Sequence, residues 1–403
     1  MADAESSEIN TARGKVSLVT FLGSGALTST AYWTQNVGQT WIVLHMGGTA
    51  ADLGALAAFQ YGPYVLFGFH GAAIAEVLNK KYMLQTCQLV LSALALCLAF
   101  LQYYELLTIS SLFGTAVVAS IINCFGKPAR QAFTAGLFKG GGLTRAIGFN
   151  AAINYATRIA VPAIAGIMIS YSPLYFFFMF CSGCYAASVV FVGFAKAESQ
   201  NSRQLYLAKS VDHAALAGLN YIYRSPTLRR TAANLVVMTV LPFSFNVFIP
   251  VLAKEHFNLS ATGYGTMLSV MAVGSVIGAI FSSRLREYRR AAVVLSLIII
   301  AISEIALAFP IWIIVSYLLL FLCGASIALF LTSSNTEFLK DTPTEMRARV
   351  AGMYDYVASG IGPLGSAFVG ILISTWGIRV TLLFCALCAL SVAISEIRAG
   401  SRG

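Results

Sequence analysis

The chain has 403 residues, of which 58% are hydrophobic and only 10% are charged. This composition excludes an ordinary water-soluble protein, because soluble domains carry about 25% charged residues. The net charge of +10 gives no support for nucleic-acid binding, since the basic residues follow a membrane topology. The sequence therefore predicts an integral membrane protein with little material left for a soluble domain.

Twelve segments are apolar enough to cross a hydrocarbon core of about 30 Å, which takes roughly 20 helical residues. In chain order they are 16–44, 52–77, 82–101, 106–126, 143–170, 173–194, 231–252, 260–283, 291–309, 311–334, 347–374 and 377–396. Residues 1–10 are polar and lack a cleavable signal, so the first span is expected to be retained. The predicted fold class is an all-α membrane protein with twelve transmembrane helices.

The distribution of lysine and arginine predicts cytoplasmic N- and C-termini, because cytoplasmic loops carry an excess of positive charge. In this orientation every basic residue falls on a cytoplasmic segment except Arg158, Lys254 and Arg379. Of these three, Arg158 lies inside a span.

The second half of the chain repeats the first at an offset of 204 residues: Gly166 corresponds to Gly370, and Arg145 to Arg349. Because both halves begin on the cytoplasmic side, the sequence predicts two parallel six-helix repeats. The expected domains are a bundle over 1–194, a cytoplasmic linker with an amphipathic helix over 195–230, and a bundle over 231–403.

No motif for catalysis, metal binding or a cofactor stands out. The eight cysteines lie in spans and predict no disulfide framework or metal site. A phosphate-binding loop is absent from the sequence. The glycines of 360–365 fit helix packing and a bend at Pro363 better than a dinucleotide site. We therefore expect neither an enzyme nor a cofactor.

Arg158 is the most informative residue, because arginine near the bilayer centre costs at least about 2.5 kcal/mol. Asn150, Asn154 and Arg158 recur every four residues and share one stripe of a helix. We expect this stripe to line a central polar cavity; the alternative is that it joins helices by hydrogen bonds. Gln35 and Gln39 form a second stripe with the same two interpretations.

Asp355 is the candidate for proton coupling, because it lies about two turns inside its span. Alternatively it pairs with Arg349 or Arg145. Glu304 is expected near the outer membrane surface, and Asp52 is expected to cap a helix.

Four stretches together resemble one family: "GKPARQAF" after span four, "NAAINYATRIAVPAIAG" in span five, "AGLNYIYRSPTLRR" before span seven and "PTEMRARVAGMYDYVASGIGPLGSAFVG" leading into span eleven. The chain resembles the major facilitator superfamily, in the branch of enterobactin-exporter-like and macrolide-efflux-like proteins. This resemblance implies a secondary transporter that works by alternating access, most often as a proton-driven exporter.

The resemblance also implies roles for particular positions. Residues 128–131 look like the family's cytoplasmic loop motif, and residues 150–166 look like its span-five signature. The loop after span two keeps the terminal basic pair of the gating motif, while Glu76 replaces aspartate. The gating candidates are Glu76, Lys80, Lys81, Arg130, Pro162, Gly166 and Pro363.

The sequence thus predicts a multi-pass exporter in a bacterial inner membrane, acting as a monomer on a small amphiphilic molecule with protons as its coupling partner. A siderophore-like, anionic or hydroxyl-rich substrate is favoured because Arg158 is basic. The alternatives are a multidrug or macrolide efflux pump, an importer of the same fold, and a membrane receptor that does not transport.

Overall fold

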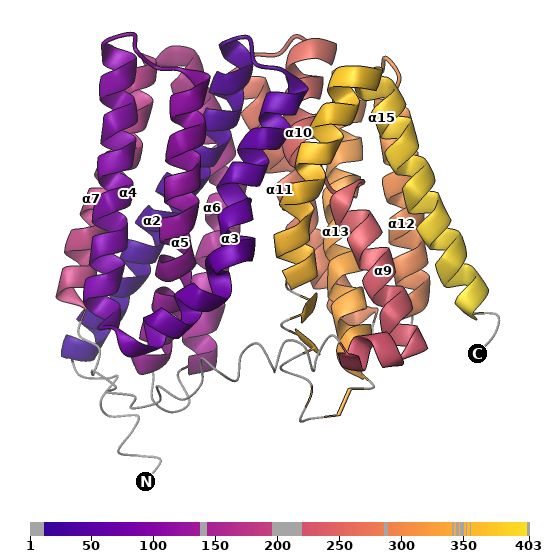
Figure 1. Cartoon of the computed structure of the whole chain (residues 1–403), viewed down its shortest axis with the longest axis horizontal. Coiled ribbons are helices and arrows are strands. Elements are labelled where there is room, and N and C mark those ends of the chain that lie inside the picture. Colours follow the sequence, from indigo (N-terminus) through magenta and orange to yellow (C-terminus); the bar gives the residue numbers. More distant parts are fainter. Residues whose placement is uncertain are drawn as a thin grey trace. The chain divides into compact units, whose positions relative to one another are not determined.

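The computed structural model describes residues 12–137, 143–195, 220–285, 289–340, 342–343, 346, 350–351, 353–354 and 356–400. All regular elements in these ranges are helices (Figure 1). The chain divides into two compact units, one of residues 1–39 and 66–208, the other of residues 40–65 and 209–403. Each unit is described below by itself.

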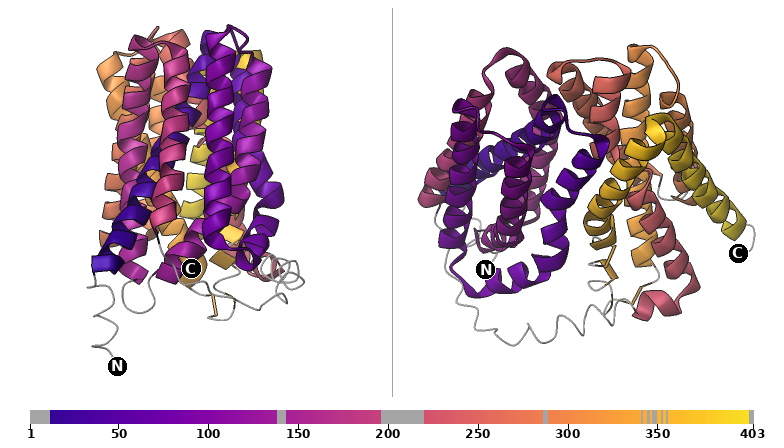
Figure 2. Two further views of the ribbon diagram at one scale, coloured as in Figure 1. Left: turned by 90° about the vertical axis from the view of Figure 1, so that its left-hand side faces the viewer. Right: turned by 45° about the horizontal axis from the view of Figure 1, so that its top comes forward.

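Unit 1 is built from long apolar helices. They are α2 (Ala12–His45) up to residue 39, α3 (Ala50–Val77) from residue 66, α4 (Lys80–Tyr103), α5 (Ile109–Leu137), α6 (Leu143–Tyr171) and α7 (Leu174–Phe194). Asn79 starts α4 by accepting hydrogen bonds from the backbone of Lys81 and Tyr82. Helix α4 packs against α5 and α7, and Ser92 bonds to Ser182 across the latter contact at 2.9 Å. Both views in Figure 2 show α2 (indigo) inclined to its neighbours.

Unit 2 contains the remaining helices. They are α9 (Pro226–Val240), α10 (Phe245–Val251), the π-helix η1 (Leu252–His256), α11 (Ala261–Arg284), α12 (Arg289–Leu307), α13 (Ile313–Lys340), the π-helix η2 (Tyr356–Ile361) and α15 (Gly362–Gly400). Helix α13 packs against both α11 and α12, and α12 also packs against α15. Gly377 has φ 79°, a conformation that glycine adopts readily, and α15 folds back there (Figure 1).

The end of α2 and the first half of α3 belong to unit 2 although they come early in the sequence. The ring of Trp41 stacks on that of Tyr264 with centroids 5.4 Å apart. The Ala51 backbone donates a hydrogen bond of 3.0 Å to the Ser374 hydroxyl, and Lys254 donates to the Leu44 carbonyl. These contacts fasten the connection between the two helices to α11, η1 and α15.

The structure confirms most of the predicted spans and corrects three. Helix α5 continues to Leu137, so the predicted loop after residue 126 is helical, with Pro128 inside the helix. The predicted span 231–252 begins earlier, at Pro226, and is interrupted between Val240 and Phe245. The predicted span 347–374 contains the π-helix η2. Proline within a span is tolerated because neighbouring helices satisfy the freed carbonyl groups.

The offset of 204 residues is visible in the helix boundaries. Helix α5 begins at Ile109 and α13 at Ile313, and α4 and α12 end at Tyr103 and Leu307. Asp52 caps α3 as expected: its carboxylate accepts from the Thr49 backbone at 2.7 Å, and its own N–H donates to the Thr49 hydroxyl at 3.3 Å. The linker predicted over 195–230 lies mostly outside the described residues.

Candidate functional site

The candidate site of unit 1 lies where α2 contacts α6. The Ser29 hydroxyl is 3.2 Å from the Asn154 side-chain oxygen and 2.7 Å from the Thr157 hydroxyl. One turn further along both helices, the Arg158 guanidinium lies over the Trp33 ring, 5.4 Å from its centroid. Matching steps of four residues bring the same faces of the two helices into register. Asn154 and Arg158 therefore share one face, as predicted.

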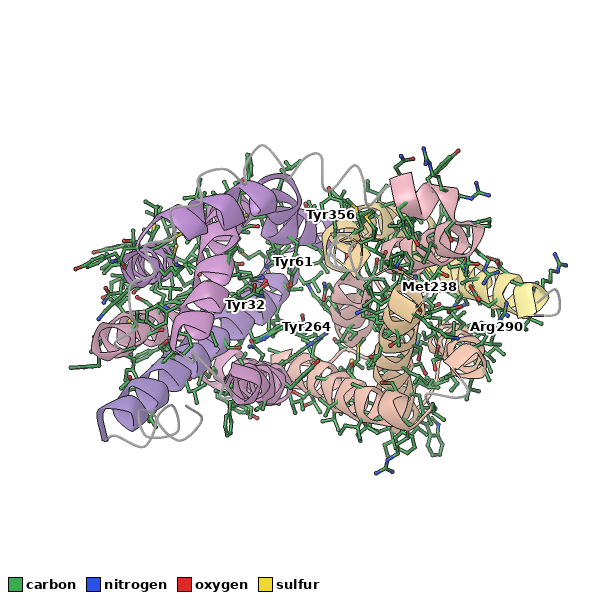
Figure 3. The ribbon with its side chains drawn as sticks, turned by 90° about the horizontal axis from the view of Figure 1, so that it is seen from below. Tyr32, Tyr61, Met238, Tyr264, Arg290 and Tyr356 are labelled. Atoms are coloured by element: carbon green, nitrogen blue, oxygen red, sulfur yellow. The ribbon has the colours of Figure 1, made fainter. Side chains whose placement is uncertain are left out.

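A second cation reaches the same part of α2 from α5. The Lys127 ammonium lies 5.2 Å from the centroid of the Tyr32 ring. The Tyr32 and Trp33 rings are 5.4 Å apart and nearly perpendicular, at 79°. Figure 3 shows Tyr32 on α2, viewed along the helices from below. We call Tyr32, Trp33, Lys127 and Arg158 the cation–aromatic cluster; both of its cationic side chains are exposed.

Both contacts in this cluster leave the charge of the cation in place. An aromatic face attracts a cation through its quadrupole, an interaction worth about 0.5–1 kcal/mol at exposed sites. Unlike a carboxylate, the ring does not neutralise the guanidinium or use its N–H donors. Arginine is especially suited to bind carboxylates, because its planar guanidinium presents paired N–H donors.

Arg130 lies deeper in unit 1 and is held by neutral groups. Its guanidinium donates to the Ser24 hydroxyl at 3.2 Å and to the Thr28 hydroxyl at 3.1 Å. It also lies over the Phe21 ring, 5.5 Å from the centroid. Gln88 donates to Thr28 at 3.1 Å and so extends this network. Because Arg130 belongs to helix α5, the loop predicted at residues 128–131 is helical, while their position on the cytoplasmic side stays a prediction.

The two predicted glutamines are buried in unit 1, with exposed fractions of 4% for Gln35 and 2% for Gln39. The Gln39 amide donates to the Thr115 hydroxyl of α5 at 3.3 Å. This bond is of the interhelical kind that the sequence left open as an alternative. Their role in lining a cavity stays a prediction.

Among the gating candidates, Lys81 has the clearest contacts. Its ammonium donates to the Gly193 carbonyl at 2.6 Å and the Ala195 carbonyl at 3.1 Å, at the C-terminal end of α7. A cation there is favoured by the helix dipole. Pro162 and Gly166 are buried within α6, and Lys80 is half-buried.

Four of the predicted residues can be placed only in part. Asp355 lies outside the described residues. Asn150, Glu76 and Pro363 belong to α6, α3 and α15, but their side chains lie outside the described part. The cavity, proton-coupling and gating roles assigned to them stay predictions.

Sequence reasoning missed Lys127, Tyr32 and Trp33 as members of the cluster. Lys127 was placed on a cytoplasmic segment with most of the other basic residues, from the distribution of charge. The aromatic pair carried a usable signal, since Tyr32 and Trp33 lie beside the polar stripe of α2. Pairing each ring with a cation required coordinates.

Unit 2 holds a polar cluster around Glu396 of α15. Its carboxylate accepts from the Asn234 amide at 2.5 Å and lies 3.5 Å from the Arg230 guanidinium. Arg290 of α12 donates to the Glu396 backbone carbonyl at 2.9 Å. Figure 3 labels Arg290 in this part of unit 2. This cluster joins α9, α12 and α15.

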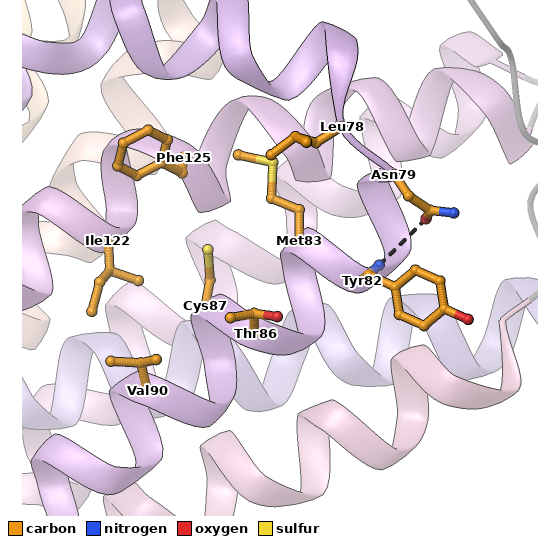
Figure 4. A pocket seen from close by; sticks show the side chains of 9 residues that line it. All are labelled: Leu78, Asn79, Tyr82, Met83, Thr86, Cys87, Val90, Ile122 and Phe125. Carbon is orange, nitrogen blue, oxygen red and sulfur yellow. Dashed lines mark hydrogen bonds between the residues drawn. The ribbon is translucent and has the colours of Figure 1, made fainter.

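A separate pocket of about 420 Å³ opens beside α4 and α5 (Figure 4). Its wall consists of Leu78, Asn79, Tyr82, Met83, Thr86, Cys87, Val90, Ile122 and Phe125. This wall is largely apolar and includes none of the predicted substrate residues. It offers no charged side chain to an ionic ligand.

Comparison with known proteins gives consistent results. A family model described as "Transmembrane secretion effector" matches residues 18–400. The staphyloferrin A transporter of Staphylococcus aureus is 22% identical, covering 89% of this chain and 90% of that protein. The multidrug efflux pump Tap of Mycolicibacterium fortuitum is 24% identical, covering 93% of each.

Solved structures of low identity share the fold. A mutant of the nucleoside transporter NupG has a TM-score of 0.77 at 13% identity, covering 96% of this chain and 99% of that chain. A bacterial homologue of the human lysosomal transporter Spinster has a TM-score of 0.75 at 12% identity, covering 97% of each. The predicted major facilitator fold is confirmed.

Proposed function

Because the chain belongs to the transmembrane secretion effector family of major facilitator transporters, we propose that it is a proton-coupled exporter of a small, anionic, siderophore-like molecule. It works by alternating access as a monomer. Its place is the bacterial inner membrane, with both termini in the cytoplasm. The membrane location is supported by nine helices in the described residues that are long and apolar enough to span a bilayer.

The cation–aromatic cluster is the observation that supports an anionic substrate. Two exposed cations from different helices lie over adjacent rings of α2. A carboxylate-bearing ligand gains charge-assisted hydrogen bonds from Arg158, while its apolar part packs on the rings. The similarity to the staphyloferrin A transporter of Staphylococcus aureus supports this substrate class.

The remaining predicted residues complete the proposal. Asn150, Asn154, Gln35 and Gln39 line the substrate path with Arg158, and Asp355 carries the coupled proton. Gating is assigned to Glu76, Lys80, Lys81, Arg130, Pro162, Gly166 and Pro363. Bending of helices at proline and glycine supports the last assignment.

The test measures accumulation of staphyloferrin A in inverted membrane vesicles, with and without an uncoupler. Energised vesicles are expected to accumulate the compound, and the uncoupler to abolish accumulation. Arg158→Ala removes a charge-assisted contact and is expected to raise the KM about ten-fold, while Arg158→Lys keeps the charge and loses less. Equal uptake by Arg158→Ala and the wild type at equal expression would exclude the cluster from substrate binding.

Multidrug efflux is the second candidate, favoured by the relative Tap and by the aromatic rings of the cluster. In the same vesicles a cationic fluorescent dye would accumulate in preference to staphyloferrin A. Accumulation in right-side-out vesicles alone would identify an importer. Binding without flux in either orientation would identify a receptor.

A further inference from the structure

Glu304 of α12 is a carboxyl group with no partner in the interior of unit 2. Its exposed fraction is 0%, and neither carboxyl oxygen has a hydrogen-bond partner among the described residues. Helix α12 packs against α13 and α15, which supply the surroundings of this side chain. Glu304 therefore differs from Glu396, whose Oε1 accepts from the Asn234 amide and lies 3.5 Å from the Arg230 guanidinium.

The titratable groups that interact with Glu304 within the described part of unit 2 are neutral thiols. They are the thiols of Cys323 on α13 and of Cys385 and Cys388 on α15. The side chains of Cys323 and Cys385 are themselves fully buried. A charged carboxylate without a cation or hydrogen-bond donor in such surroundings costs several kcal/mol. The neutral acid is the form that this geometry accommodates.

A cationic side chain contacts the backbone about one helical turn beyond Glu304. The Arg379 guanidinium of α15 donates to the Ala308 carbonyl at 3.1 Å, beyond the end of α12. The Ala308 N–H in turn donates to the Glu304 carbonyl at 3.1 Å. Four residues of helix correspond to about 6 Å along the axis, within the combined reach of the two long side chains.

We propose that Glu304 is a proton-binding site of unit 2, with Arg379 as the partner of its ionised form. In the arrangement seen here the carboxyl holds its proton. When movement of α15 against α12 admits water, the O–H bond breaks, the proton passes to water, and the carboxylate pairs with the guanidinium. This inference rests on the proposed function for its role in coupling and adds a site distinct from Asp355.

Infrared difference spectroscopy of the full-length protein in nanodiscs tests proton binding without a substrate. The wild type is expected to show the carbonyl band of a neutral carboxylic acid at pH 7, and Glu304→Gln to lose it. Glu396→Gln and Glu304→Asp are the controls that keep the band. Arg379→Gln should move disappearance of the band to higher pH, because the cation that favours ionisation is gone. An identical band in the wild type and Glu304→Gln overturns the proposal.

Transport in proteoliposomes tests coupling, with staphyloferrin A as the probe. Exchange at equal pH needs no net proton movement, so Glu304→Gln is expected to exchange within about two-fold of the wild type. Accumulation driven by a pH gradient should be lost in this variant and retained in Glu304→Asp. Gradient-driven accumulation by Glu304→Gln at the wild-type level overturns the coupling role. If the wild type itself neither exchanges nor accumulates, the proposed function fails, and the infrared band alone decides whether Glu304 binds a proton.

Discussion

The two units share helix boundaries but differ in the charges that they bury. Helices α5 and α13 begin at corresponding positions, yet Ser334 of α13 stands where α5 has Arg130. Conversely, Phe100 of α4 stands where α12 has Glu304. The repeat is thus visible in these helix ends, while the polar residues in the two interiors differ. In unit 1, hydroxyl groups and an aromatic ring hold the guanidinium of Arg130. Unit 2 instead buries the carboxyl groups of Glu304 and Glu396.

Removing Glu396 is expected to have the largest effect on stability. Glu396→Ala leaves the Asn234 amide and the Arg230 guanidinium without their carboxylate. Breaking a buried ionic pair costs about 3–5 kcal/mol, and the partial exposure of Arg230 places this variant at the lower end. Thermal unfolding in detergent measures the loss. Glu396→Gln keeps an oxygen for Asn234 and should lose less; equal melting temperatures for the alanine variant and the wild type would contradict this role.

Close helix packing gives the next largest effect, and its sign is expected to differ between Gly278 of unit 2 and Gly183 of unit 1. A Cβ atom at Gly278 of α11 would lie 2.0 Å from the Ala325 carbonyl of α13, whereas a Cβ at Gly183 of α7 would meet nothing within 4 Å. Gly278→Ala should therefore lower the free energy of unfolding by about 1–3 kcal/mol. Gly183→Ala should leave it unchanged or raise it by up to about 1 kcal/mol. Thermal unfolding in detergent compares the two variants. Equal shifts in melting temperature would contradict the predicted difference between the two glycines.

Loss of Arg130 should be milder than loss of Glu396. In Arg130→Met the Ser24 hydroxyl still donates to the Phe21 carbonyl at 3.0 Å, and the Thr28 hydroxyl still bonds to Ser188 at 2.8 Å. We expect Arg130→Met to lower the free energy of unfolding by about 1–2 kcal/mol, the contribution of one or two hydrogen bonds. Thermal unfolding checks the rank. A loss larger than that of Glu396→Ala would show that the basic interior depends more on its charge than the acidic one.

The smallest effect is expected in the cation–aromatic cluster. Trp33→Leu removes the ring beneath Arg158 and should weaken staphyloferrin A binding two- to five-fold, equivalent to about 0.5–1 kcal/mol. Titration of the purified protein with the compound measures the Kd. Trp376→Leu is the control, because Trp376 packs on Phe384 in unit 2. A matching change in both variants would remove the special role of Trp33.

Hydropathy was sufficient to place most helices, because a bilayer requires long apolar segments regardless of their partners. It failed where tertiary context overrides local signals. Pro128 reads as a helix end, yet α5 passes through it. The spacing of Asn154 and Arg158 was enough to recognise a polar stripe. It could not show which helix this stripe contacts. The surroundings of Glu304 come from residues far away in the sequence, on α13 and α15. Cys388, for example, follows it by 84 positions.

Two continuous helices connect the units without a loop. The division between units falls after Gln39 within α2 and after Val65 within α3, where Pro63 has already removed a backbone hydrogen bond. A helix bends most easily where such a bond is missing, so Pro63 is the expected bending point of α3.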